Sequence, residues 1–137
     1  MQIIQAKIKT IMLITGFLTC TMAYAIFLPQ AALTSLFGES LSGGALAEII
    51  VRSWGTLITL VGAMLVYGAF RPDQRTLILT IAGLSKLVYV VLLMLYGREY
   101  FPMILTPVVV DSIAVILFAI YLASDFRAFS ESSRVVA

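Results

Sequence analysis

One lysine and one aspartate stand inside segments that are otherwise almost wholly apolar. Lys86 lies near the centre of Ile81–Leu95 (IAGLSKLVYVVLLML), and Asp111 lies in the stretch PVVVDSIAV. Either residue costs roughly 2.5–3.5 kcal/mol at the centre of a membrane helix, and a partner charge or a wet cavity usually offsets that cost. Because the two signs are opposite, we predict an intramembrane Lys86–Asp111 pair. Such a pair either fixes helix register or lines a site that binds a solute or relays a proton.

Two further charges, Glu48 and Arg52, are four residues apart and therefore share one helix face. Together with Lys86 and Asp111 they sum to zero charge and are expected in the same half of the membrane. We expect the four to belong to a polar pocket open to the outside, with a snorkelling interfacial pair as the alternative for Glu48 and Arg52. Neighbours in sequence that could complete its hydrogen bonds are Ser53, Trp54, Thr56, Ser85, Tyr89 and Ser112.

The composition indicates that these residues are held by membrane-spanning helices. Hydrophobic residues make up 61% of the 137-residue chain, against roughly 45–50% in soluble domains. A helix needs about 20 apolar residues to cross a hydrocarbon core of about 30 Å. Four segments qualify, at residues 10–28, 47–70, 76–97 and 102–124. We therefore predict an all-α fold, an antiparallel bundle of four transmembrane helices in one membrane domain over residues 1–137.

The connections between the predicted spans fit this topology. The polar breaks RPDQR (Arg71–Arg75) and GREYFP (Gly97–Pro102) are short, so the helices they join must be antiparallel neighbours. The link from Pro29 to about Leu46 is longer and contains the glycine- and serine-rich piece FGESLSGG. Before that piece, QAALTSLF is either a short helix lying in the membrane interface or a plain loop.

Small residues mark where the predicted helices approach one another. Gly55 and Gly62 share a stripe of the second span with Thr59 and Val66. Gly16 and Ala23 do the same on the first span, and Gly83 on the third. Small side chains let transmembrane helices pack closely. Pro107 leaves a backbone carbonyl without its usual partner about one turn before Asp111, where it could face the same pocket.

The lysines and arginines predict the orientation, because cytoplasmic loops carry an excess of both. With a cytoplasmic N-terminus, Arg98 alone lies outside, and the inside residues are Lys7, Lys9, Arg71, Arg75, Arg127 and Arg134. We therefore expect both termini in the cytoplasm. The competing interpretation of the first segment is a signal peptide, since Lys7 and Lys9 precede an apolar run and an A-x-A sequence, Ala23–Ala25.

Several classes of function are disfavoured by the residues the chain contains. It has one cysteine, Cys20, and no histidine, which excludes an internal disulfide, a Cys/His zinc site and histidine-ligated haem. No metal site or resident cofactor is expected. No basic stripe points to nucleic acid. No nucleophile–base constellation indicates an enzyme, although a Schiff base on Lys86 with Asp111 as counter-ion is chemically conceivable.

A family resemblance covers Arg52–Leu122. The run RSWGTLITLVGAMLVYGAFRPDQR, followed by SKLVYVVLLML and DSIAVILFAIYL, resembles small bacterial four-helix membrane proteins of unknown function that are DoxX-like in outline. Its marks are Arg52, Trp54-Gly55, the Arg71-Pro72 turn, Ser85-Lys86 and Asp111. The resemblance implies a bacterial inner membrane and carries no activity with it.

Two functions therefore compete. The first is a binding or transport protein whose pocket takes a small solute, an ion or a proton, with the lipid bilayer around it and a homo-oligomer completing the pathway. The second is a structural or accessory subunit, in which the intramembrane charges serve assembly with other membrane subunits and bind no ligand. Lys86 and Asp111 are central to both hypotheses.

Overall fold

A computed structural model describes the backbone of residues 2–135 and the side chains of residues 6–126. Every element in that part of the chain is helical, and four segments are long and apolar enough to cross a membrane: Ala6–Phe27, Gly44–Phe70, Pro72–Tyr96 and Arg98–Phe126. The predicted all-α, four-span architecture is confirmed. The side chains of Arg127 and Arg134, which entered the orientation prediction, lie outside the described residues.

The helices follow the predicted order, with some different limits. The α-helices are α1 (Gln2–Cys20), α2 (Tyr24–Phe27), α3 (Pro29–Phe37), α4 (Gly44–Phe70), α5 (Arg75–Tyr96) and α6 (Phe101–Val135). Short 3-10 turns complete the chain: η1 (Thr21–Ala23), η2 (Pro72–Gln74) and η3 (Arg98–Tyr100). The first helix begins at Gln2 rather than near residue 10, and α6 continues past residue 124. Hydropathy marks where a helix meets lipid, whereas the helix itself continues until a residue breaks it.

The segment after the first span contains the short helix that was one of two alternatives. Leu28 precedes proline and leaves the helical region at φ −127°, which ends α2. Pro29 then begins α3, at a position where its missing N–H is not needed. Gly38 ends α3 in the left-handed conformation at φ +70°, donating its N–H to the Thr34 carbonyl at 3.0 Å.

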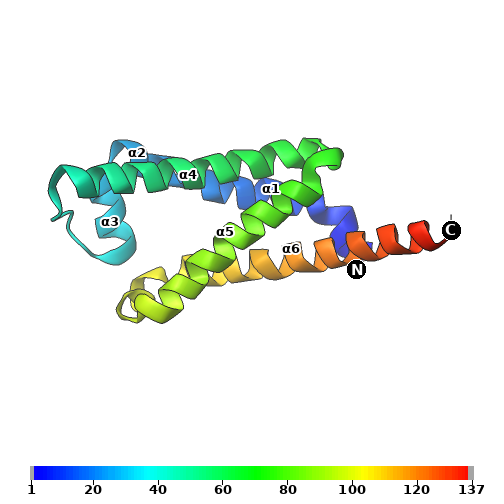
Figure 1. Cartoon of the computed structure of the whole chain (residues 1–137). Helices are drawn as coiled ribbons and strands as arrows, with labels where there is room; N and C mark the ends of the chain where they lie inside the picture. The colour runs from blue at the N-terminus through cyan, green and yellow to red at the C-terminus, as the bar shows by residue number, and fades with distance from the viewer. Residues whose placement is uncertain (1, 136–137) are drawn as a thin grey trace.

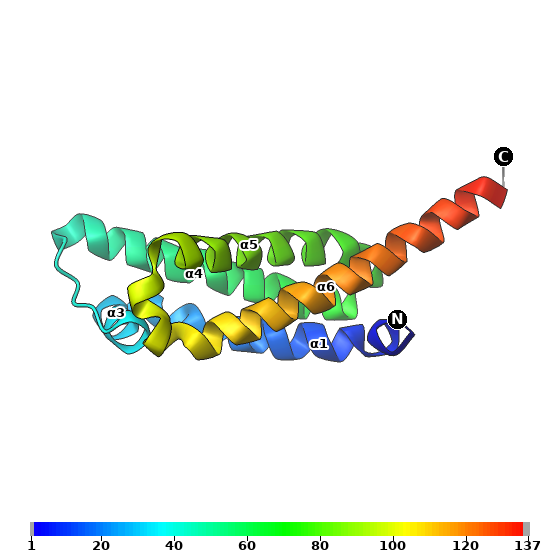
Figure 2. The same ribbon diagram turned by 90° about the horizontal axis from the view of Figure 1, so that it is seen from below.

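The spans form two pairs that meet at one end of the molecule. In Figure 1, α1 runs beside α4, α5 crosses in front of α6, and the pairs diverge toward the end where α3 lies, here called the α3 end. Both chain termini lie at the opposite end, near η2, as the turned view in Figure 2 also shows. An even number of spans places both termini on the same side of a membrane.

A core of buried apolar residues joins the two pairs at the η2 end. It draws on all four spans, and its buried members are Ile8, Met12, Leu65, Ala69, Ile78, Leu79, Ala82, Ala114 and Phe118. Hydrogen bonds also join neighbouring elements at the same end. Arg75 donates to the carbonyls of Gly68 (3.2 Å) and Ala69 (2.9 Å) in the last turn of α4, where Gly68 also accepts the backbone N–H of Arg71 at 3.2 Å. Thr76 of α5 donates to Asp125 of α6 at 2.6 Å.

Glycines set the close approach of α1 to α4. A Cβ added to Gly62 would lie 2.8 Å from the backbone nitrogen of Cys20 and 2.9 Å from the Gly16 carbonyl oxygen. One added to Gly55 would lie 2.8 Å from the Ala25 Cβ. At Gly83, by contrast, the nearest atom would be a Phe118 carbon at an ordinary 3.7 Å. The close approach of α4 to α1 at Gly62, and to Ala25 of α2 at Gly55, therefore depends on the absence of a side chain at these two positions.

Gly62→Ala is expected to destabilise the fold by about 1–3 kcal/mol, because the new methyl must push two backbones apart. Gly83→Ala is the matched control on α5 and should be neutral or slightly stabilising, since its methyl has room and alanine favours the helix. Both can be measured as shifts in the SDS-induced unfolding midpoint. Equal midpoints for the two variants would contradict the close α1–α4 contact.

Candidate functional site

The structure brings Lys86 of α5 and Asp111 of α6 into direct contact. The Lys86 ammonium donates to Asp111 Oδ1 as a salt bridge, and the two side chains are only 9% and 18% exposed. Among the side chains that the structure describes, Asp111 is the one hydrogen-bond partner of the ammonium. An ammonium has three N–H donors and a carboxylate has two oxygens, so both groups retain hydrogen-bonding capacity.

The lengths of the two helices set this contact. Lys86 lies ten residues before the end of α5 at Tyr96, and Asp111 lies ten residues after the start of α6 at Phe101. At a rise of about 1.5 Å per residue, both lie about 15 Å from the turn between the helices. The short η3 turn makes the helices antiparallel neighbours, so the two side chains arrive at the same height.

The pair faces a cavity of about 550 Å³ between the two helix pairs. The first pair contributes Thr15, Leu18, Thr19, Thr21, Met22, Trp54, Leu57, Ile58 and Val61, and α3 contributes Leu36. The second pair contributes Ser85, Lys86, Val88, Tyr89, Leu92, Thr106, Pro107, Val110 and Asp111. Most of these side chains are apolar, and the ion pair supplies the only formal charges of the lining.

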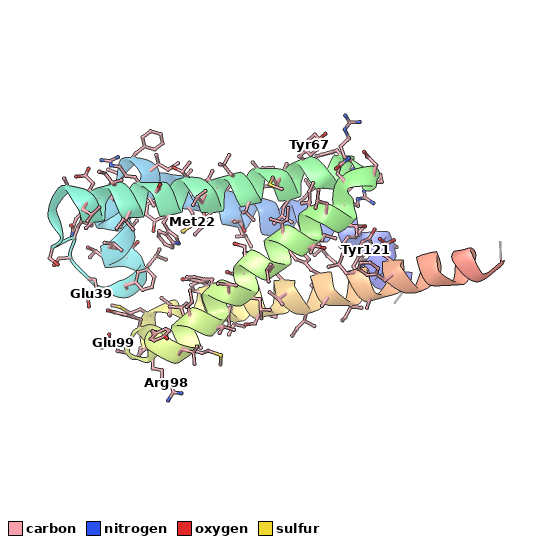
Figure 3. All side chains as sticks on the ribbon, in the orientation of Figure 1. Met22, Glu39, Tyr67, Arg98, Glu99 and Tyr121 are labelled. Carbon is pink, nitrogen blue, oxygen red and sulfur yellow. The ribbon has the colours of Figure 1, made fainter. Side chains whose placement is uncertain are left out.

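Aromatic residues close the cavity toward the α3 end. The ring of Phe37, at the end of α3, lies 6.3 Å from the Trp54 ring on α4 and 5.5 Å edge-on from Tyr100. Phe37 thereby bridges the two diverging pairs. A smaller cavity of about 200 Å³ adjoins it, and Trp54 and Tyr89 line both. In Figure 3, Met22 lies on the side of α4 that faces α5, while Glu39, Arg98 and Glu99 gather at the α3 end.

The cavity reaches the lipid-facing surface sideways. Leu57 of α4 and Leu92 of α5 line it and are 63% and 50% exposed. On the other side, Leu18 of α1 is 53% exposed and Val110 of α6 is 39% exposed. These apolar rims lie on the surface that a bilayer would cover. If these helices cross a membrane as their length and composition allow, these rims are where the cavity would meet lipid.

Five of the residues expected at the pocket lie outside this cavity. Of the sequence-predicted set, the cavity is lined by Trp54, Ser85, Tyr89, Lys86 and Asp111, whereas Glu48, Arg52, Ser53, Thr56 and Ser112 do not line it. The hydroxyls of Thr56 and Ser112 donate to carbonyls of their own helices, at 2.8 and 2.7 Å. The pocket is also largely apolar rather than polar.

Arg52 instead makes contacts with its own helix and with the end of α2. It donates to Glu48 Oε1 from two nitrogens, at 3.0 and 2.6 Å, and it also donates to the carbonyl of Ile26. That carbonyl is among the last of α2, which the helix itself leaves without a partner. Arg52 and Trp54 are two positions apart, about 200° around the helix, so they point to opposite sides. The charge spacing identified the pair with Glu48 correctly but not the face on which it lies.

Several lining residues were not foreseen from the sequence, above all those of α1. Thr15 and Thr19 are four apart and buried, which is a signal for a packed face in an apolar helix. Thr19 donates to the Thr15 carbonyl at 2.7 Å, so its hydroxyl is already paired within the helix. Pro107 lines the cavity one turn before Asp111, whereas Met103, near whose carbonyl Pro107 removes the usual helical donor, is not among the lining residues.

Comparison with models of protein families, with curated proteins and with solved structures finds no match for this chain. Within residues 6–126, no three His, Cys, Asp or Glu side chains gather closely enough to hold a metal ion. The lining offers charge interaction and hydrogen bonding at Lys86 and Asp111, and it also contains the hydroxyl of Tyr89 and the indole of Trp54.

Lys86→Met is expected to destabilise the protein by about 3–5 kcal/mol, because it leaves the Asp111 carboxylate buried without its counter-charge. Lys86→Met/Asp111→Leu should recover most of that loss, since replacing a buried pair with apolar residues of similar volume is often neutral. SDS-induced unfolding monitored by circular dichroism measures both. A single variant as stable as the wild type would show that the pair does not form in the folded protein.

Proposed function

We propose that this chain is a multi-pass protein of the bacterial inner membrane that binds a small molecule in the cavity between its two helix pairs. The observation that carries the proposal is that the buried Lys86–Asp111 pair lines a cavity instead of being sealed by packing. A purely structural pair gains nothing from such exposure. Intramembrane ionisable residues are functional candidates by default, and a cavity of about 550 Å³ falls in the usual range for small-molecule sites.

The proposed setting of the protein follows from its charges. Residues 1–137 form one membrane domain, with both termini in the cytoplasm and the α3 end facing outward. The DoxX-like resemblance of residues 52–122 supports a bacterial inner membrane. Binding is the step that the cavity supports best. Transport of a solute or proton would need a continuous path, which a homo-oligomer of this four-span chain could complete.

One observation favours a second function, that of an accessory subunit. The cavity opens sideways at Leu57, Leu92, Leu18 and Val110, where side chains of a partner helix could enter it. Lys86 and Asp111 would then receive a polar side chain of that partner. The two functions differ in what occupies the cavity, a small molecule or a protein, and that difference can be measured.

Native mass spectrometry of the protein released from mild detergent should show a bound small molecule. Ile58→Phe is expected to remove that adduct, because Ile58 lines the cavity on α4. Leu60→Phe is the matched control, since Leu60 lies on the same helix, 56% exposed and outside the lining, and it should keep the adduct. Unrelated protein subunits in place of the adduct would favour the accessory function. An adduct that survives both variants would contradict binding in this cavity.

The orientation is a separate expectation. In a chain whose Cys20 is replaced by serine, a cysteine at Glu99 should react with a membrane-impermeant maleimide in intact spheroplasts. A cysteine at Asp73 should react only after lysis. Both positions are exposed and lie in opposite turns, η3 and η2, so each is the control for the other. The reverse pattern would place the termini outside.

A further inference from the structure

The cavity selects for a molecule that is mostly hydrocarbon. Its walls carry leucine, isoleucine and valine side chains from α1, α4, α5 and α6, and its largest ring is the Trp54 indole. A hydrocarbon ligand that comes from the bilayer meets walls of similar polarity and has no hydration shell to lose. A strongly hydrated solute, such as a free ion or a sugar, would have to lose its water to walls that offer few hydrogen bonds in return.

The ion pair is the one charged group in these apolar walls. Because its net charge is zero, it restricts the charge that a bound ligand can carry. Lys86 and Asp111 neutralise each other. An anion placed beside them would leave one uncompensated negative charge at about 15 Å from the nearer turn, and a cation would leave one positive charge. A neutral oxygen leaves the balance intact. It can accept a hydrogen bond from a remaining N–H of Lys86, and a hydroxyl can also donate to Asp111 or Tyr89.

The route into the cavity is sideways rather than from water. Toward the α3 end, Phe37 bridges Trp54 and Tyr100, and Tyr100 in turn donates to Glu39 at 3.4 Å. Toward the η2 end, the buried core of all four spans fills the space between the helix pairs. Between these closures, the lining residues Leu57, Val88 and Leu92 are about half or more exposed on the face that lipid covers. A molecule dissolved in the bilayer can reach the cavity between α4 and α5.

We infer that the ligand is a neutral lipophile bearing one hydrogen-bonding oxygen, a hydroxyl or carbonyl, taken laterally from the bilayer and held by that oxygen at the Lys86–Asp111 pair. This inference rests on the proposed binding function and adds to it the ligand class and the route. The charged residues of the cavity lining are Lys86 and Asp111, and its uncharged polar side chains include those of Ser85, Tyr89 and Thr106.

The chain carries its own reporter for this test, because Trp54 is its only tryptophan and lines the cavity. The protein in nanodiscs is titrated with a bromoalkanol, and with the bromoalkane and bromoalkanoate of the same chain length, while bromine quenching of Trp54 fluorescence is followed. The alkanol should quench saturably and half-saturate at about a tenfold lower membrane concentration than the alkane, as expected for one hydrogen bond to a charged group. The ionised alkanoate should bind more weakly than the alkanol.

Two variants separate the cavity from the surrounding lipid. In Trp54→Phe/Leu60→Trp the single tryptophan moves to an exposed position of α4 outside the lining, and quenching there should rise linearly with all three probes. In Lys86→Met/Asp111→Leu the cavity remains but the pair is gone, so the preference of alkanol over alkane should disappear. That variant replaces both charges together, so it leaves no lone buried charge to unfold the protein.

The results that overturn the inference are distinct from those that overturn binding itself. Equal saturation by alkane and alkanol in the wild type would mean that acyl chains merely fill the cavity. Tighter binding of the alkanoate would mean that the site takes anions. Either result would contradict the proposed ligand class. The proposed binding function would still stand if native mass spectrometry shows an adduct that Ile58→Phe removes. Linear quenching by every probe, together with no adduct, would contradict both the ligand class and the binding function.

Discussion

The arrangement of this protein depends on the requirement that two opposite charges, once inside a membrane, stay together. Neither Lys86 nor Asp111 is stable alone in hydrocarbon, and the contact between them compensates both. Because they lie at equal distances from the turn that joins α5 and α6, their contact fixes the register of those helices. It also fixes which face of the helix pair turns toward α1 and α4. The ion pair in the cavity lining is thus a consequence of how α5 and α6 pack together.

The cavity itself follows from unequal packing along the molecule. Small residues draw α1 against α4, and buried apolar residues from all four spans fill the η2 end. Within the described residues, no comparable core of all four spans forms beyond the η2 end, and the pairs diverge toward the α3 end (Figure 1). Phe37 on α3 bridges the far end. The helix pairs therefore enclose space at the height of the ion pair, walled mostly by apolar side chains. This lining is the basis on which we propose a neutral lipophile rather than a hydrated solute.

Much of this could be predicted from the sequence, for physical reasons that differ by residue. Apolar length determines a membrane span almost directly, so the four spans were predictable. Equal spacing from a short turn made the meeting of Lys86 and Asp111 predictable too. The direction of Arg52 was not, because its partner, the Ile26 carbonyl, exists only once the chain breaks at Leu28 and α2 ends. Nor were Thr15 and Thr19 foreseeable as lining, since the face that α1 turns to the cavity depends on how Gly16 meets Gly62.

The most direct measurement of the central claim is the dipolar coupling between the Lys86 Nζ and the Asp111 carboxyl carbon in lipid bilayers. The chain has only three lysines, Lys7, Lys9 and Lys86, so ¹⁵Nζ-lysine and ¹³Cγ-aspartate labelling gives few pairs to resolve in solid-state NMR. Direct contact predicts strong ¹⁵N–¹³C dephasing that Lys86→Met abolishes and Asp125→Asn leaves unchanged. Absence of that dephasing in the folded wild-type protein would contradict the ion pair, and with it the site built on it.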